Sequence, residues 1–129
     1  MKIAINGFGR IGRSVFRILE EQDDIEVVAI NDLFDYGALR YLLSYDTVMG
    51  PFGKNLTLQD DHFVTDKGRV KLLSVRNPED LPWRELGVDA VVEATGVFRK
   101  REQLQQHLAA GAGRVVLTVP SKDPVDYTV

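Results

Sequence analysis

The most informative run of residues lies at the start of the chain: Lys2-Ile3-Ala4-Ile5-Asn6-Gly7-Phe8-Gly9-Arg10-Ile11-Gly12. A short β-branched run precedes the glycines, and residues 10–21 follow with apolar side chains at helical spacing. The glycines form G-x-G-x-x-G between a predicted strand and a predicted helix. Asp32 stands twenty residues past Gly12, at the end of a second predicted strand. This context predicts a dinucleotide-binding turn.

Each position of the turn has a physical role. Gly7 permits the tight turn, Gly9 lets a pyrophosphate approach the backbone, and Gly12 lets the helix pack close to the strand. The backbone N–H groups of Arg10 and Ile11 are expected to face the pyrophosphate at the positive end of the helix dipole.

The residue after the second strand indicates which dinucleotide binds. Asp32 is expected to accept hydrogen bonds from the adenosine ribose hydroxyls. Its carboxylate repels a 2′-phosphate, and Leu33 adds no basic group to offset that repulsion, so the expected cofactor is NAD rather than NADP. A flavin dinucleotide would use the same turn, so the motif alone leaves FAD open.

Strand and helix patterns alternate along the chain. Further strands are expected at residues 25–31, 89–94 and 114–119, and further helices at residues 36–44 and 101–110. The nearly all-apolar strands are typical of a parallel sheet covered on both faces. Residues 55–76 alternate around a glycine-bearing turn, which indicates an antiparallel insertion. The expected fold class is α/β, a Rossmann-type doubly wound, mostly parallel sheet with a small antiparallel edge insertion.

Helical spacing also predicts which side chains pack inward. The expected core residues of the first two helices are Ile11, Val15, Ile18, Leu19, Leu39, Leu42 and Leu43. Tyr41 is likewise expected in the core rather than at a cofactor, and Trp83 is expected to plug a loop onto the core.

Length and composition narrow the function classes. A chain of 129 residues fits one domain, and 16 basic against 19 acidic residues give a net charge of −3, which argues against a nucleic-acid-binding module. No apolar run approaches the ~20 residues of a membrane span, so we expect a soluble, cytoplasmic protein with no membrane partner. The chain has no cysteine, which excludes disulfides and a cysteine nucleophile within it.

The other candidates for chemistry carry weaker signals. His62 and His107 have no second ligand at metal spacing, so both are expected at the surface and no metal site is predicted. The carboxylate pairs Asp23-Asp24 and Asp60-Asp61 are adjacent in sequence and do not face one site, so both are expected in turns. The basic run Arg99-Lys100-Arg101 is expected to be a solvated edge.

One longer string resembles a known family. Ile5-Asn6-Gly7-Phe8-Gly9-Arg10-Ile11-Gly12-Arg13 is similar to the N-terminus of phosphorylating glyceraldehyde-3-phosphate dehydrogenases and of the related erythrose-4-phosphate dehydrogenases. Shorter matches follow over essentially the whole chain, at residues 29–33, 45–47, 81–83, 86–89, 93–98 and 118–121. The first string is highly specific, and the shorter ones are persuasive jointly.

The resemblance implies the NAD-binding domain of a cytosolic, homotetrameric enzyme. In that family a small phosphorylated aldehyde is oxidised to an acyl-thioester on a cysteine, hydride passes to NAD, and an acyl phosphate is released. The resemblance also implies cofactor contacts beyond the glycine turn and Asp32. These are Asn31 in the matching stretch, Arg76 near the adenine, Thr95 and Gly96 in a turn under the cofactor, and Thr118 beside the nicotinamide ribose.

Two departures from the family pattern matter. Val119 stands where the family usually has alanine, which would narrow the nicotinamide pocket. The family's catalytic cysteine and general-base histidine lie beyond Val129, so residues 1–129 are expected to be a truncated NAD-binding domain, inactive by itself and without a catalytic residue. A stand-alone NAD-binding module without catalysis is the alternative from another class, and erythrose-4-phosphate is the alternative substrate.

Overall fold

A computed structural model of the chain describes residues 1–33, 35–44, 56–95 and 101–118. The strands in these ranges are β1 (Lys2–Asn6), β2 (Glu26–Asn31), β3 (Leu56–Gln59), β4 (His62–Thr65), β5 (Gly68–Leu73), β6 (Ala90–Glu93) and β7 (Arg114–Leu117). The helices are α1 (Arg10–Glu20), α2 (Tyr36–Ser44), α3 (Trp83–Leu86) and α4 (Arg101–Ala109), with a 3-10 turn η1 (Pro78–Asp80). The alternation expected from the sequence is confirmed, with boundaries that differ by one or two residues.

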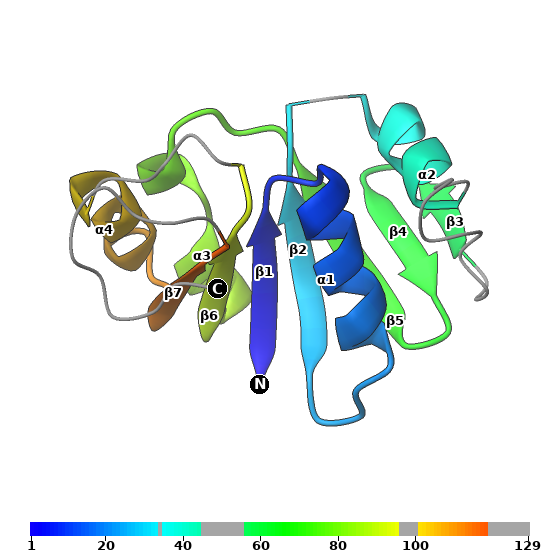
Figure 1. Cartoon of the computed structure of the whole chain (residues 1–129), viewed down its shortest axis with the longest axis horizontal. Helices are drawn as coiled ribbons and strands as arrows, with labels where there is room; N and C mark the ends of the chain where they lie inside the picture. The colour runs from blue at the N-terminus through cyan, green and yellow to red at the C-terminus, as the bar shows by residue number, and fades with distance from the viewer. Residues whose placement is uncertain (34, 45–55, 96–100, 119–129) are drawn as a thin grey trace.

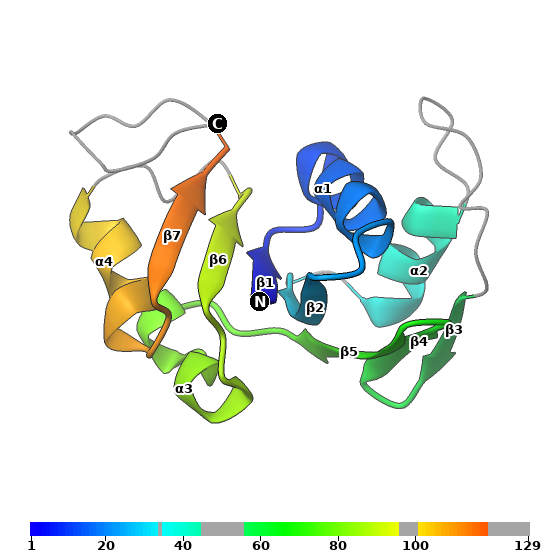
Figure 2. The ribbon, with the colours of Figure 1, turned by 90° about the horizontal axis from the view of Figure 1, so that it is seen from below.

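The strands form one sheet in the order β3-β4-β5-β2-β1-β6-β7. Neighbours from β5 through β7 pair in parallel, whereas β4 pairs antiparallel with both β3 and β5. Figures 1 and 2 show α1 and α2 on one face of this sheet and α3 and α4 on the other. This arrangement confirms the doubly wound fold class and the antiparallel insertion at one edge.

Side chains that alternate along β1 belong to two separate cores. Ile3 and Ile5 join the larger cluster, which also contains Phe16 of α1. Ala4 points to the other face, where it joins the cluster of Trp83, the first residue of α3. Trp83 is fully buried, so its expected place on the core is confirmed.

The inward face of α1 differs from the predicted one. Ile11 and Ile18 are 46% and 59% exposed, whereas Gly12 and Phe16 are buried. Because Gly12 has no side chain, this side of the helix comes closest to the sheet, and that contact turns Phe16 inward instead of the isoleucines. The members of the predicted face that do pack against the core are Val15 and Leu19.

The predicted face of α2 is largely right, with one error. Leu39 and Leu43 are fully buried, as predicted. Tyr41 is 63% exposed, so its expected place in the core was wrong. Tyr41 lies two residues from each buried leucine, and positions two apart point to different sides of a helix. The side chain of Leu42 lies outside the described residues.

Smaller expectations concern turns and helix length. Asp23-Asp24 and Asp60-Asp61 both lie in turns, as predicted. No helix in the four described ranges is long and apolar enough to cross a membrane. The basic run Arg99-Lys100-Arg101 falls mostly outside the described residues.

Candidate dinucleotide-binding site

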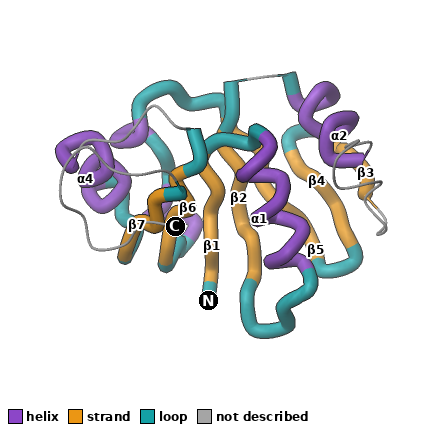
Figure 3. The backbone as a smooth tube through the Cα atoms, in the orientation of Figure 1, coloured by secondary structure: helices purple, strands orange, loops and turns teal. Residues whose placement is uncertain are grey.

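The parallel strands bring the predicted site residues to one edge of the sheet. β1 ends at Asn6, which is level with Asn31 of β2 on one side and Glu93 of β6 on the other. The chain leaves β1 toward β2 and later returns to β6 on the opposite side, so a topological switch point lies between β1 and β6. Figure 3 shows the loops that follow β1, β2 and β6 along this edge. Ligands of open α/β sheets bind at such a point, beyond the carboxyl ends of the strands.

The glycine turn is held by contacts that only glycine permits. Gly7 has φ of +96°, and a Cβ there would lie 2.7 Å from the backbone nitrogen of Thr95. A Cβ on Gly12 would lie 2.1 Å from the carbonyl oxygen of Gly7. The Gly7 N–H donates to the carbonyl of Asn31 at 2.8 Å. The turn therefore packs directly against β2 and against the residue that follows β6.

The N-terminus of α1 beside Gly9 is open. Gly9 is the N-cap of α1, no side chain caps this end, and the first turn carries no acidic residue. A Cβ on Gly9 would find no described atom within 4 Å. Unpaired N–H groups and the helix dipole make such an end a site for a phosphate group. The Arg10 and Ile11 backbone lies there, so the predicted pyrophosphate position fits the geometry.

Asp32 lies beside the turn and also supports it. The Asp32 Oδ2 accepts a hydrogen bond from the Phe8 N–H at 2.7 Å. The Asp32 backbone N–H donates to Leu73 at the end of β5, and its carbonyl accepts from the Ser74 hydroxyl. The predicted ribose ligand thus has a second, structural contact, which the sequence pattern did not indicate.

Asn31 faces the protein rather than open space. Its Oδ1 accepts from the Val75 N–H at 2.8 Å, and its Nδ2 donates to the Val75 carbonyl at 2.9 Å and to Asn6 Oδ1 at 2.7 Å. Asn31 is 4% exposed, so its role in the site is to hold the loop after β5. Arg76 follows Val75 directly and is exposed, at the same edge as Asp32.

Thr95 and Thr118 both bond to Glu93. The Thr95 hydroxyl donates to Glu93 Oε1 at 2.6 Å, and its N–H donates to the same oxygen at 3.2 Å. The Thr118 hydroxyl donates to the Glu93 backbone carbonyl at 3.0 Å. The structure thus brings these two predicted residues together through a residue that was not predicted. Gly96 and Val119 lie outside the described residues.

The expected surface position of His107 is wrong. His107 of α4 is fully buried, and its Nε2 lies 2.6 Å from Glu93 Oε2. The Trp83 indole N–H donates to His107 Nδ1 at 3.0 Å. The available signal was the carboxylate of Glu93 directly after the apolar run Ala90-Val91-Val92, because a buried carboxylate needs polar partners. His62, by contrast, is partly exposed, and its Nδ1 lies 2.8 Å from Asp61 Oδ1.

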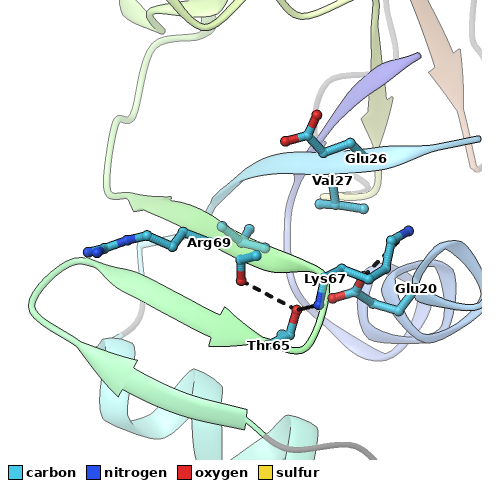
Figure 4. Close-up of a pocket in the computed structure, with 8 residues that line it drawn as sticks. Glu20, Glu26, Val27, Thr65, Lys67 and Arg69 are labelled. Atoms are coloured by element: carbon cyan, nitrogen blue, oxygen red, sulfur yellow. Dashed lines mark hydrogen bonds and ion pairs between the residues drawn. The ribbon is translucent and has the colours of Figure 1, made fainter. Parts of the chain in front are cut away.

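A small pocket lies at the other end of α1, away from this edge (Figure 4). Lys67 extends into it, and its Nζ donates to the carbonyls of Leu19, Gln22 and Ile25. Glu20 Oε2 lies 3.8 Å from the same ammonium. This pocket is occupied by the lysine that closes the helix end. No group of three or more metal-ligating side chains occurs in the described part of the chain.

Comparison with known protein families matches residues 1–101 to the family described as "Glyceraldehyde 3-phosphate dehydrogenase, NAD binding domain". The chain belongs to this family. Glyceraldehyde-3-phosphate dehydrogenase of Streptomyces coelicolor is 48% identical over 130 residues, which cover 100% of this chain and 38% of that protein. The enzyme of Escherichia fergusonii is 47% identical, and glyceraldehyde-3-phosphate dehydrogenase A of Escherichia coli K12 is 46% identical. Each of these two alignments covers 95% of this chain and 37% of the relative.

Membership in this family identifies the dinucleotide that the chain binds. As a glyceraldehyde-3-phosphate dehydrogenase NAD-binding domain, the chain has NAD as its dinucleotide, which decides the choice that the glycine motif alone left open. The open helix end beside Gly9 and the carboxylate of Asp32 fit a dinucleotide without a 2′-phosphate. The chain spans 37–38% of the length of the curated relatives it matches.

Proposed function

We propose that this chain supplies the NAD site of a phosphorylating glyceraldehyde-3-phosphate dehydrogenase, in which hydride passes from the aldehyde substrate to NAD. The observation that carries the proposal is the open, uncapped N-terminus of α1 beside Gly9, with Asp32 next to it. The N-terminus of α1 suits the pyrophosphate anion, and the carboxylate of Asp32 suits the hydroxyls of the adenosine ribose.

The proposed contacts follow the order of the cofactor along the edge. The N–H groups of Arg10 and Ile11 bind the pyrophosphate, and Asp32 binds the adenosine ribose. Arg76 lies on the adenine side, since Val75 before it is bonded to Asn31 beside Asp32. Thr118 lies on the nicotinamide side, next to the end of β6. The bound cofactor supplies the hydride acceptor, and these residues bind and orient it.

The rest of the reaction needs groups outside these 129 residues. The chain has no cysteine, so it holds no thiol for an acyl-thioester. We propose that the catalytic residues, the phosphorylated-aldehyde site and the contacts of a homotetramer belong to the remaining length seen in the relatives. Glyceraldehyde-3-phosphate is the favoured substrate because the relatives carry that name, with erythrose-4-phosphate as the alternative. We also propose that the protein is located in the cytoplasm.

Titration calorimetry tests the cofactor site. The chain is expected to bind NAD near 1:1 and to bind NADP at least tenfold more weakly, because the Asp32 carboxylate repels a 2′-phosphate. Equal affinity for the two dinucleotides would contradict the role of Asp32. No heat with NAD at millimolar concentration would contradict the proposed site itself.

A second candidate function is an NAD-binding module without catalysis, which the absence of cysteine favours. The two candidates differ in one assay. The native, full-length protein is incubated with NAD, inorganic phosphate and either glyceraldehyde-3-phosphate or erythrose-4-phosphate, and NADH is followed by absorbance. Turnover with either aldehyde supports the enzyme and identifies the substrate. NAD binding without turnover supports the module.

A further inference from the structure

A line of buried polar side chains crosses the sheet directly beneath the glycine turn. Asn31 of β2 donates to Asn6 Oδ1 of β1, and Asn6 Nδ2 donates to Glu93 Oε2 of β6 at 2.8 Å. Glu93 continues to His107 of α4, and His107 to Trp83 of α3. None of these side chains is more than 4% exposed. Buried polar groups are costly unless each one is bonded, so a complete network here needs an explanation.

Glu93 is the centre of this network, because every neighbour donates to it. The Trp83 indole is a donor only, so His107 Nδ1 accepts from it, and Nε2 carries the proton that faces Glu93 Oε2. Asn6 donates to the same oxygen, and the N–H and hydroxyl of Thr95 donate to the other one. Four hydrogen bonds therefore converge on one carboxyl group, whose two oxygens together accept all of them.

The carboxylate ties together the two loops at the switch point. Asn6 is the residue before Gly7, and Thr95 is the second residue after β6. The position of a Gly7 Cβ lies 2.7 Å from Thr95 N, so the two loops touch with no room for a side chain. A shift of Thr95 would therefore move the glycine turn. The Glu93 carbonyl also holds the Thr118 hydroxyl, which brings a third loop under the same residue.

We propose that Glu93 is a positioning residue of the NAD site, whose buried carboxylate fixes Thr95 against the glycine turn, with His107 as its fixed hydrogen-bond donor. The proposal rests on the proposed placement of NAD at this edge. It assigns no contact between Glu93 and the cofactor, because Glu93 is fully buried and acts through Thr95 and Asn6.

The Glu93→Gln variant tests this role with little change in shape. An amide has one acceptor oxygen, so its NH2 group must face either the Thr95 donors or the donors of Asn6 and His107. We expect NAD affinity, measured by calorimetry, to fall at least tenfold. The matched control is Glu20→Gln, which alters another buried carboxylate, at the far end of α1. That variant is expected to bind NAD within twofold of the wild type, whatever it does to the melting temperature.

Two His107 variants separate positioning from simple loss of stability. His107→Gln keeps an N–H near the position of Nε2 and so keeps a donor to Glu93, whereas His107→Asn keeps an acceptor near Nδ1 for Trp83 and removes that donor. The proposal predicts weaker NAD binding in His107→Asn than in His107→Gln. If Glu93→Gln does not fold, these two His107 variants test the positioning role of Glu93.

Three results would overturn the proposal while the proposed function stands. Glu93→Gln binding NAD within twofold of a wild type that binds NAD would overturn it alone and leave the proposed function intact. The proposal would also be overturned if Glu93→Gln and Glu20→Gln lost NAD affinity equally. Equal losses of NAD affinity in the two His107 variants would overturn it as well. A wild type that does not bind NAD would instead overturn the proposed function, and this inference with it.

Discussion

Asp32 has one observed role and one proposed role, and one substitution separates them. Its Oδ2 accepts the Phe8 N–H and so braces the glycine turn, and we propose that its charge also opposes a 2′-phosphate. Removal of the whole side chain would disturb both functions at once. Asparagine in its place keeps an acceptor for Phe8 and removes only the charge.

Asp32→Asn is therefore expected to change the choice between cofactors without changing the fold. NAD affinity should fall about tenfold, or about 1.4 kcal/mol, since a charge-assisted hydrogen bond becomes a neutral one. NADP affinity should stay the same or rise. Calorimetry with both dinucleotides measures the ratio.

The control for Asp32→Asn is Asp35→Asn, which changes the same charge three residues away. Asp35 Oδ2 accepts from the Ala38 N–H at the start of α2, so its role is local to that helix. If both variants shift the NAD-to-NADP ratio equally, net charge at this edge sets the preference and the specific role of Asp32 is wrong.

Single-residue roles could be predicted where a local motif fixes them. The positions of Gly7, Gly12 and Asp32 follow from the strand, turn and helix pattern, and the structure brings all of them together at one edge. His107 could not be placed in this way. Its burial depends on Glu93, fourteen residues earlier, and on Trp83 from another helix, and such long-range bonds leave no local periodicity.

Among the elements, α1 has two ends that differ in how their backbone groups are satisfied. Its N-terminus has no side-chain cap and faces the candidate site, whereas its C-terminal end is closed by Lys67 from the β4–β5 turn. Carbonyls at a helix C-terminus have no partners within the helix, and a cation there also interacts favourably with the helix dipole. Figure 4 shows Lys67 reaching this end beside Glu20.

Lys67→Met is expected to destabilise the chain and leave the cofactor site intact. The loss of hydrogen bonds to Leu19, Gln22 and Ile25 should lower the free energy of unfolding by about 1–2 kcal/mol. NAD affinity should be unchanged, because the site lies at the opposite end of α1. Urea unfolding and calorimetry measure the two quantities.

Arg69→Met is the matched control, since Arg69 is exposed on β5 and its side chain points away from Lys67 in Figure 4. An equal loss of stability in both variants would show that Lys67 contributes only its general charge, and not a specific closure of the helix.

Elements were easier to predict than the faces they bury. The order of strands and helices followed from apolar runs and glycine breaks. The predicted face of α1 was right at Val15 and Leu19 and wrong at Ile11 and Ile18. A periodicity count assigns no weight to Gly12, although its missing side chain permits the closest approach of the helix to the turn. Leu39 and Leu43 were predicted correctly because both lie on one side of a helix that covers the sheet.

In the whole molecule, the candidate cofactor site lies at one edge of the sheet, and the apolar cores lie on its two faces. The parallel strands converge on the edge with the glycine turn, whereas the antiparallel strands β3 and β4 extend the sheet at the far side (Figure 1). The polar network through Asn6 and Glu93 lies at the switch point, and the two apolar cores fill the faces. We propose that NAD binds at this one edge.

Backbone amide NMR during an NAD titration tests that claim most directly. We predict that the largest shifts fall on residues 8–12, Asp32 and Thr95, with none on β3 and β4. Gly9→Val should keep the spectrum of the folded chain, because its Cβ meets no described atom within 4 Å, and should lose the NAD-induced shifts, because its side chain fills the open helix end. Shifts centred on β3 and β4, or full NAD binding by Gly9→Val, would contradict the account.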